Sequence, residues 1–232
     1  MITIQWMPVF TEQLSYDPNI TYFEPEPAFR YLTAQRDQTD YLRCPGLSNF
    51  LKNTFVIKSP YDFNIKVTNE WDVQTDRFGQ AFFNENISVR NPQTHKDPLI
   101  IQTFPKYLFI TEHNKPVTVS VIPWMFKANP YGIVPGSFDI TQWIRPVNLA
   151  MEVYTPGIIE FKRGEVLYAV RFETDDTVRL DRGEFTEDIK QTMASCLNVQ
   201  NYAPGMNLKS LYSSGQHYIN LMKRKIFGGT RI

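Results

Sequence analysis

The sequence predicts a mainly β protein of α+β class overall, in which a β-sandwich or jelly-roll-like domain is followed by two C-terminal α-helices. Three observations support this prediction. Apolar and polar residues alternate with period two in several segments between residues 54 and 172, which is typical of strands with one buried face. Aromatic residues make up 14% of the chain and favour strands. Sixteen prolines and eleven glycines indicate many turns and few long helices.

The N-terminal part begins with a predicted strand over residues 2–10. Residues 15–29 are expected to be extended, because Pro25 and Pro27 disfavour a helix there. A short helix is predicted over residues 29–35.

Residues 54–68 have the pattern of a β-hairpin. Phe55 and Ile57 are two positions apart between polar residues 54 and 58, residues 59–62 (SPYD) supply turn chemistry, and alternation is clear over residues 63–67. One face of this hairpin is expected to be buried and the other to be wet.

The middle of the chain is less regular. Residues 70–98 are rich in Asn, Asp and Gln and predict a loop-rich insertion with short strands. Two further strands are predicted over residues 99–111 and 117–124, with a turn at 113–116 between them. An irregular connection is expected over residues 125–136.

The segment 133–172 is the most informative part of the sequence for the architecture. Residues 147–153 alternate strictly, and after a Pro-Gly turn residues 159–161 alternate again. After a charged glycine turn, the even-numbered residues of 166–172 (VLYAVRF) are apolar, and Leu167 and Ala169 are apolar on the other face, which predicts a strand buried on both sides.

The pattern changes to helical spacing after Gly183. Helices are predicted over residues 184–200, with acidic residues in the first turn, and over residues 207–226. The chain is therefore divided into a β-rich core domain, 1–182, and a C-terminal helical appendage, 183–232, packed on it.

Charge and segment composition disfavour two classes of partner. The chain has 24 basic and 24 acidic residues, whereas proteins that bind nucleic acid usually carry a basic excess, so nucleic acid is an unlikely partner. No leader-like segment and no run of about 18 apolar residues occurs, so neither export nor membrane association is expected. The expected location is the cytoplasm.

Cys44 and Cys196 are the only two cysteines. Two thiols this far apart in the sequence, without a larger cysteine framework, are expected to be free and buried rather than paired. Cys44 lies in a Cys-Pro-Gly turn that can expose a thiol, but no activating group can be placed beside it, so a buried structural cysteine is favoured.

The weak candidates for a metal site are His95, His113 and Glu112. Both histidines flank the predicted strand 99–111 and can approach each other in space. Glu112 and His113 are adjacent, however, and neighbours on a strand point to opposite faces. The spacing favours two solvated loop histidines, so no metal and no other cofactor is expected.

Trp143, Arg145, Glu152 and Tyr154 are the candidate site residues. Trp143 and Arg145 alternate, so they can face the same side, where an arginine can stack on the indole. One interpretation is a ligand or partner patch formed with Tyr154 and Glu152. The other is structural, with the tryptophan closing the core and the arginine paired with Asp139. No catalytic constellation is identified, because the nucleophile-elbow and phosphate-loop motifs are absent.

Two pieces of the sequence resemble an uncharacterised protein family of tailed bacteriophages, notably marine ones. One runs from residues 41–45 (YLRCP) through 52–60 (KNTFVIKSP), and the other from 136–140 (GSFDI) through 143–146 (WIRP). The resemblance implies a phage gene product and assigns no catalytic residue.

Residues 159–172 are similar to a segment of β-clip and jelly-roll proteins, including nucleotide-trimming enzymes of the dUTPase type. Those enzymes need a catalytic aspartate in a defined motif and a glycine-rich C-terminal arm. This chain ends in FGGTRI and lacks the rest, so the resemblance implies only the fold.

The function expected from the sequence is that of a non-catalytic, phage-encoded structural or interaction protein. It would be a virion component or a binder of a host factor, with a protein partner or a homo-oligomer, located in the host cytoplasm or assembled into the virion. The alternative is a small-ligand-binding or nucleotide-processing enzyme that uses the aromatic-rich interior of the sandwich.

Overall fold

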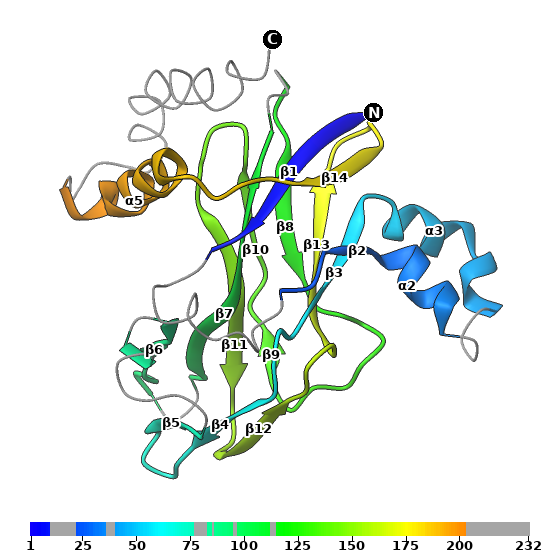
Figure 1. Cartoon of the computed structure of the whole chain (residues 1–232). Coiled ribbons are helices and arrows are strands. Elements are labelled where there is room, and N and C mark those ends of the chain that lie inside the picture. Colours follow the sequence, from blue (N-terminus) through cyan, green and yellow to red (C-terminus); the bar gives the residue numbers. More distant parts are fainter. Residues whose placement is uncertain are drawn as a thin grey trace.

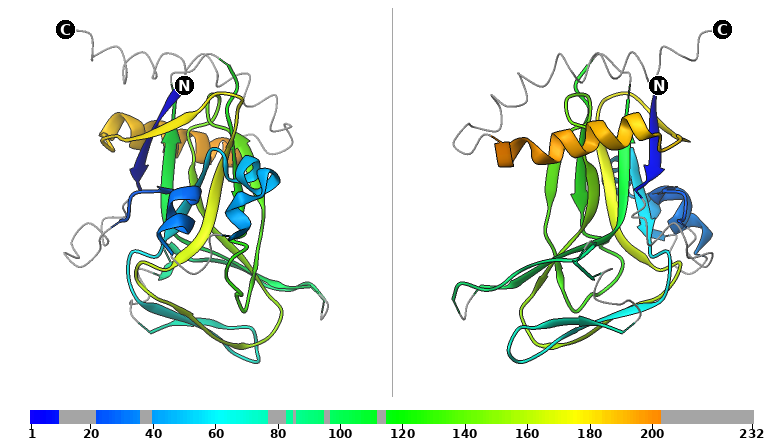
Figure 2. Two further views of the ribbon diagram at one scale, coloured as in Figure 1. Left: turned by 90° about the vertical axis from the view of Figure 1, so that its right-hand side faces the viewer. Right: turned by 60° about the vertical axis from the view of Figure 1, so that its left-hand side comes forward.

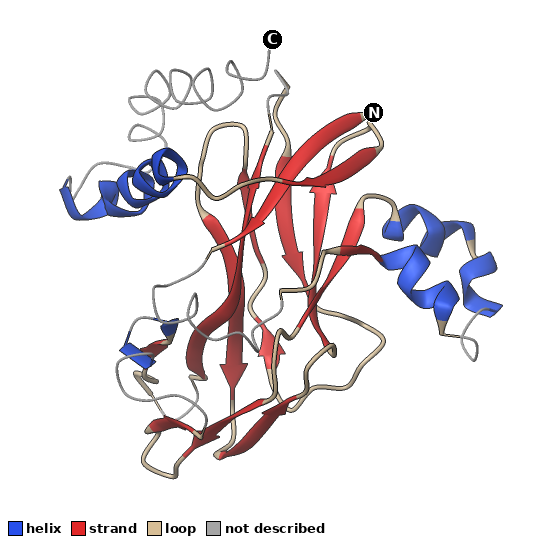
Figure 3. Ribbon diagram, viewed as in Figure 1, coloured by secondary structure: helices blue, strands red, loops and turns tan. Residues whose placement is uncertain are grey.

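The computed structural model describes residues 1–9, 22–35, 40–76, 83–84, 86–94, 97–111 and 115–202 of the 232-residue chain. Its strands outnumber its helices (Figure 3). The strands are β1 (Ile2–Pro8), β2 (Glu26–Pro27), β3 (Thr54–Lys58), β4 (Phe63–Val67), β5 (Val73–Thr75), β6 (Ser88–Arg90), β7 (Leu99–Ile110), β8 (Thr118–Ile122), β9 (Gly132–Ile133), β10 (Gly136–Asp139), β11 (Pro146–Val153), β12 (Gly157–Phe161), β13 (Val166–Glu173) and β14 (Val178–Arg182). The helices are α2 (Ala28–Ala34), α3 (Pro45–Leu51) and α5 (Glu187–Tyr202), with a 3₁₀ turn, η1, at Asp40–Arg43.

The strands form three sheets (Figure 1). Sheet A has the order β14-β1-β7-β11-β9, with β6 also paired to β7. Sheet B has the order β10-β8-β13-β3-β2, and the small sheet C has the order β12-β4-β5. All pairs are antiparallel except β1 with β14, which are parallel. Sheet C lies at the end of the molecule that is lowest in Figure 1.

Sheets A and B enclose the main core. Every second residue of β11 is buried, as the alternating sequence predicts. The ring of Phe109 on β7 contacts that of Phe172 on β13 edge-on, with 5.2 Å between centroids. The hydroxyl of Tyr168 on β13 donates a hydrogen bond of 3.3 Å to the carbonyl of Pro105 on β7. The two sheets therefore pack face to face, and the mainly β class is confirmed.

Short helices cover the outer face of sheet B. Leu32 of α2 and Leu51 of α3 are buried in a cluster with Val56 of β3 and Ala169 of β13. This cover explains why β13 is buried on both faces, as its two apolar sides predict.

Helix α5 covers part of the outer face of sheet A. In the right-hand view of Figure 2 it crosses the strands. Ile189 is buried in a cluster with Met7 of β1, Leu108 of β7 and Ile144. The predicted helix over residues 184–200 is thus confirmed with a start at Glu187. The predicted helix over residues 207–226 lies outside the described residues, and the division at residue 182 stays a prediction.

The predicted hairpin over residues 54–68 is wrong, because β3 and β4 belong to sheets B and C. The backbone of the link between them is hydrogen-bonded to the turn at residues 164–165. Ser59 N–H donates to the Glu165 carbonyl and Gly164 N–H donates to the Ser59 carbonyl, each at 2.8 Å. Tyr61 is buried within this link. The turn residues therefore carry the chain from one sheet to the next.

The strands around the charged glycine turn are also separated. β12 pairs with β4, whereas β13 pairs with β3 and β8, so the two are not hydrogen-bonded partners. Gly164 has φ +79°, a backbone conformation that side chains disfavour, and the turn lets the chain pass from sheet C to sheet B.

Candidate functional site

Strand β11 separates the four candidate residues into two pairs. Trp143 and Arg145 precede its first residue, whereas Glu152 and Tyr154 stand at its end. Arg145 and Glu152 are seven positions apart on an extended chain, or roughly 20 Å at about 3.3 Å per residue. A single patch of all four residues is therefore not formed.

The first pair forms an aromatic and cationic cluster. The Arg145 guanidinium lies 4.7 Å from the ring centroid of Trp143 and 5.2 Å from that of Phe138. The two rings meet edge-on at 6.0 Å. The predicted stacking of Arg145 on the indole is present, and all three side chains are half-buried.

A helical turn positions this cluster between sheets B and A. Trp143 N–H donates to the Asp139 carbonyl at 3.0 Å. The Asp139 carboxylate accepts hydrogen bonds from the backbone N–H and the hydroxyl of Thr141. Ile144 is buried in the cluster that includes Ile189 of α5, so its neighbours Trp143 and Arg145 are held beside the contact between α5 and sheet A. The stacking of Arg145 on the indole agrees with both interpretations, so the choice between a patch and a structural role for Trp143 and Arg145 stays a prediction.

The second pair is held by a hydrogen bond on the surface. The Tyr154 hydroxyl donates to Oε2 of Glu152 at 3.2 Å, and this bond, followed by the carboxylate charge, raises the pKa of Tyr154. The Glu152 side chain lies over Gly132 of β9, where a Cβ would come within 3.2 Å of Oε2. Gly132 therefore leaves the space that Glu152 occupies.

Tyr154 begins an exposed segment, which we call the tip loop (residues 154–158, YTPGI). Its first three residues connect β11 of sheet A to β12 of sheet C, and Gly157 and Ile158 are the first two residues of β12. The side chains of Tyr154 and Ile158 are both 62% exposed. Both residues therefore leave apolar surface in contact with water. Sequence reasoning identified Tyr154 but missed Ile158, because strand alternation does not reveal which face is covered.

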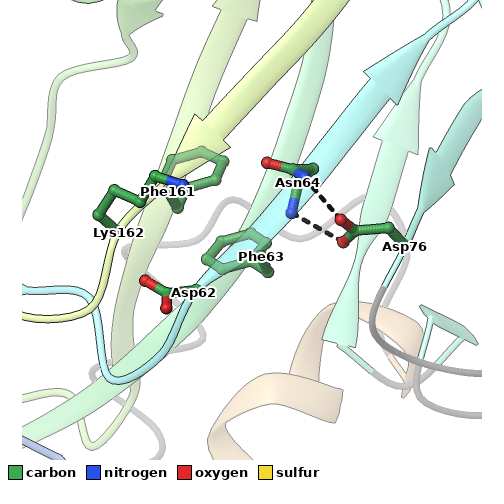
Figure 4. A pocket seen from close by; sticks show the side chains of 6 residues that line it. All are labelled: Asp62, Phe63, Asn64, Asp76, Phe161 and Lys162. Atoms are coloured by element: carbon green, nitrogen blue, oxygen red, sulfur yellow. Dashed lines mark hydrogen bonds between the residues drawn. The ribbon is translucent and has the colours of Figure 1, made fainter.

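A pocket of about 330 Å³ lies over sheet C (Figure 4). It is lined by Asp62, Phe63, Asn64, Asp76, Phe161 and Lys162. Its carboxylates already accept backbone hydrogen bonds, Asp62 from Arg163 N–H at 2.7 Å and Asp76 from Asn64 N–H at 2.9 Å. Asp76 also accepts from the Asn64 side-chain amide at 2.6 Å. The pocket residues therefore hold sheet C together. No pattern in the sequence predicts that residues 62–64, 76 and 161–162 lie close together.

Aromatic rings fill the space between the sheets where an interior ligand would bind. Tyr107 contacts Tyr22 edge-on at 5.6 Å and Trp6 at 5.9 Å. The Tyr107 hydroxyl donates to the Phe23 carbonyl at 2.8 Å. Burial raises the pKa of Tyr22, Tyr107 and Tyr168, so these phenols stay neutral. The enzyme alternative stays a prediction, and these contacts do not favour it.

The metal candidates Glu112, His113 and His95 lie outside the described residues. Within the described part of the chain, no three His, Cys, Asp or Glu side chains are grouped so as to hold a metal ion. In the same residues, no helix has the length and apolarity needed to cross a bilayer.

Both cysteines are free, but they differ from the prediction in burial. Cys44 is exposed at the N-cap position of α3, whereas Cys196 is partly buried against sheet A. Burial raises the pKa of the Cys196 thiol, and a backbone hydrogen bond with Ile144 opposes this shift. The expectation of a buried Cys44 is wrong.

We therefore expect iodoacetamide to alkylate Cys44 several-fold faster than Cys196 in the folded protein at pH 8, because the thiolate is the reactive form. Mass spectrometry of the labelled peptides measures both rates. In urea the two rates should converge. Equal rates in the folded protein would contradict the burial of Cys196.

Comparison with known protein families, with curated proteins and with solved structures finds no match to this chain.

Proposed function

We propose that this chain is a non-catalytic structural or interaction protein of a tailed phage, either a virion component or a binder of a host factor. The observation that carries the proposal is the tip loop, which presents Tyr154 and Ile158, each 62% exposed, four positions apart in the chain. Such a pair is an anchor for a partner surface, because tyrosine is enriched among the residues that dominate binding energy.

The tip loop is suited to binding because its backbone and the Tyr154 side chain already have restricted conformational freedom. Pro156 fixes one backbone dihedral angle, and the Tyr154 hydroxyl is tied to Glu152. The tip loop also follows β11 directly and ends within β12, which is paired with β4. A side chain that is ordered before binding loses less entropy on binding, which strengthens the complex.

The phage origin is supported by the resemblance of residues 41–60 and 136–146 to a family of phage proteins. It implies action in the host cytoplasm, with assembly into the virion as one outcome. The filled interior agrees with a protein that acts through its surface.

A photo-crosslinking amino acid at position 154 tests the proposal in cells infected with the phage that carries this gene. We expect a crosslink to one partner protein, because the side chain at this position lies in the contact. The same amino acid in place of Arg179, which is exposed on β14, is the matched control and should give no such crosslink. Mass spectrometry of the product and of purified virions identifies the partner and its location.

The substitution Ile158→Asp should lower the crosslink yield about tenfold or more, because it places a charge in an apolar contact. Equal labelling from positions 154 and 179, or no effect of Ile158→Asp, would overturn the proposal.

A further inference from the structure

Strand β12 forms one edge of sheet C, since β4 is the one strand that pairs with it among the described residues. Among the strands that the structure describes, it alone carries a large apolar side chain that is exposed, Ile158. Two other edge strands have stronger protection: β2 has two residues and ends in Pro27, and β14 carries three charged residues, Arg179, Asp181 and Arg182, whereas β12 carries one, Glu160. An apolar edge strand with few charges is a site for the addition of another strand.

The direction of the β12 backbone groups follows from the partners of β4. Asn64 N–H donates to Asp76 and Thr68 N–H donates to the Asp72 carbonyl, so the even-numbered residues of β4 point toward β5. In an antiparallel strand the N–H and C=O of one residue point to the same side. Ile65 and its odd-numbered neighbours therefore bond to β12.

The register of the β4 and β12 pair then identifies the free groups. Ile159 is opposite Ile65, so Gly157, Ile159 and Phe161 bond inward to β4. The N–H and C=O of Ile158 and Glu160 point away from the sheet. No hydrogen bond from a described residue reaches these four groups.

We propose that the β12 edge pairs with β12 of a second copy of this chain, antiparallel and about a two-fold axis at Ile159. Ile158 then lies opposite Glu160 of the second copy, and Glu160 lies opposite Ile158. This register bonds all four outward groups of each copy. A strand shifted by two residues would place Pro156 opposite Glu160, and proline has no N–H to donate.

The side chains agree with the same register. Ile159, which is 3% exposed, lies opposite its own counterpart at the axis, with both side chains on the buried faces of their own copies. Gly157 lies opposite Phe161 of the second copy, and a Cβ on Gly157 would meet no atom within 4 Å, so space is present. Glu160 faces an isoleucine rather than a second carboxylate, which avoids repulsion of like charges. A symmetric pair uses the same patch on both copies, as two-fold dimers do.

This inference rests on the proposed function, because it names the partner that covers Ile158. Sedimentation velocity of the full chain over a wide concentration range should show a species of twice the chain mass. Hydrogen exchange by NMR should show protection of the Ile158 and Glu160 amides that rises with concentration. The Ile159 amide, which bonds to β4, is the internal control and should be protected equally at all concentrations.

The substitution Ile158→Pro removes one outward N–H from each copy and none that bonds to β4. We expect it to weaken the dimer about tenfold or more, since two hydrogen bonds and an apolar side chain are lost. Met125→Lys, at an exposed apolar residue outside β12, is the control and should leave the dimer unchanged.

A monomer at every concentration, or a dimer with exchange-exposed Ile158 and Glu160 amides, would overturn the pairing. The wild-type exchange result decides this even if Ile158→Pro fails to fold. A monomer that still crosslinks a different protein through position 154 would sink the dimer and leave the proposed function standing. A monomer at every concentration that also gives no crosslink from position 154 would overturn both the β12 pairing and the proposed function.

Discussion

Replacing Phe63 with alanine is expected to lower the free energy of unfolding by about 3–5 kcal/mol. Phe63 is 3% exposed and stacks on Phe161 of β12, with ring planes 9° apart and centroids 4.3 Å apart. It also contacts Phe104 of β7 at 4.6 Å and Tyr61 at 5.5 Å. The substitution therefore leaves a cavity where sheet C joins sheet A.

Urea denaturation followed by tryptophan fluorescence measures this effect. Phe29→Ala is the matched control, because Phe29 lies on α2 with 46% of its side chain exposed, and it should cost less than about 1 kcal/mol. Similar losses for the two variants would contradict the packing of sheet C on the sandwich.

Replacing Asn53 with alanine is expected to cost about 2–4 kcal/mol, because the side chain ties the turn after α3 to the link between β13 and β14. Its amide nitrogen donates to the carbonyls of Thr174 at 3.2 Å and Asp176 at 2.8 Å. Its oxygen accepts from Val178 N–H at 2.9 Å. The net loss is roughly 1 kcal/mol for each hydrogen bond.

The backbone of Asn53 adds to this cost, since its φ of +57° is left-handed, where asparagine and glycine are tolerated and alanine is not. Asn53→Gly removes the same hydrogen bonds and keeps this conformation. We expect it to be more stable than Asn53→Ala by about 1 kcal/mol, as measured by the same urea titration. If Asn53→Gly is as stable as the wild type, the three hydrogen bonds contribute nothing.

Period-two patterns predicted where strands lie. The strands at residues 99–111 and 117–124 are present as β7 and β8, and the alternation of residues 147–153 is present in β11. The short helix at 29–35 is present as α2. Residues on one face of a strand share the same burial, so apolar and polar residues alternate along it. A pattern within one short segment is therefore enough to locate a strand.

Strand pairing was beyond the reach of the same patterns. Residues 54–58 and 63–67 were expected to pair across a turn, yet they lie in different sheets. A turn of four residues can close a hairpin or pass the chain between sheets. The choice depends on partners distant in sequence, such as Glu165 for Ser59.

The candidate site shows the same limit. The sequence identified Trp143, Arg145, Glu152 and Tyr154 by residue type, and the stacking of Arg145 on Trp143 is present. It could not show that β11 holds the two pairs apart, nor that Ile158 is uncovered while Ile159 beside it is buried. Which face of a strand is covered depends on the elements that pack on it.

The sequence by itself determined the mainly β class, most strand positions and the helix that begins at Glu187, because each follows from the spacing of apolar residues along a short segment. The tertiary structure alone decided which strands pair, that α2 and α3 cover sheet B, and that β12 is left as an edge with Ile158 exposed. These features arise from contacts between residues far apart in the chain, where the free energy of burial is shared among several elements and no local pattern records it.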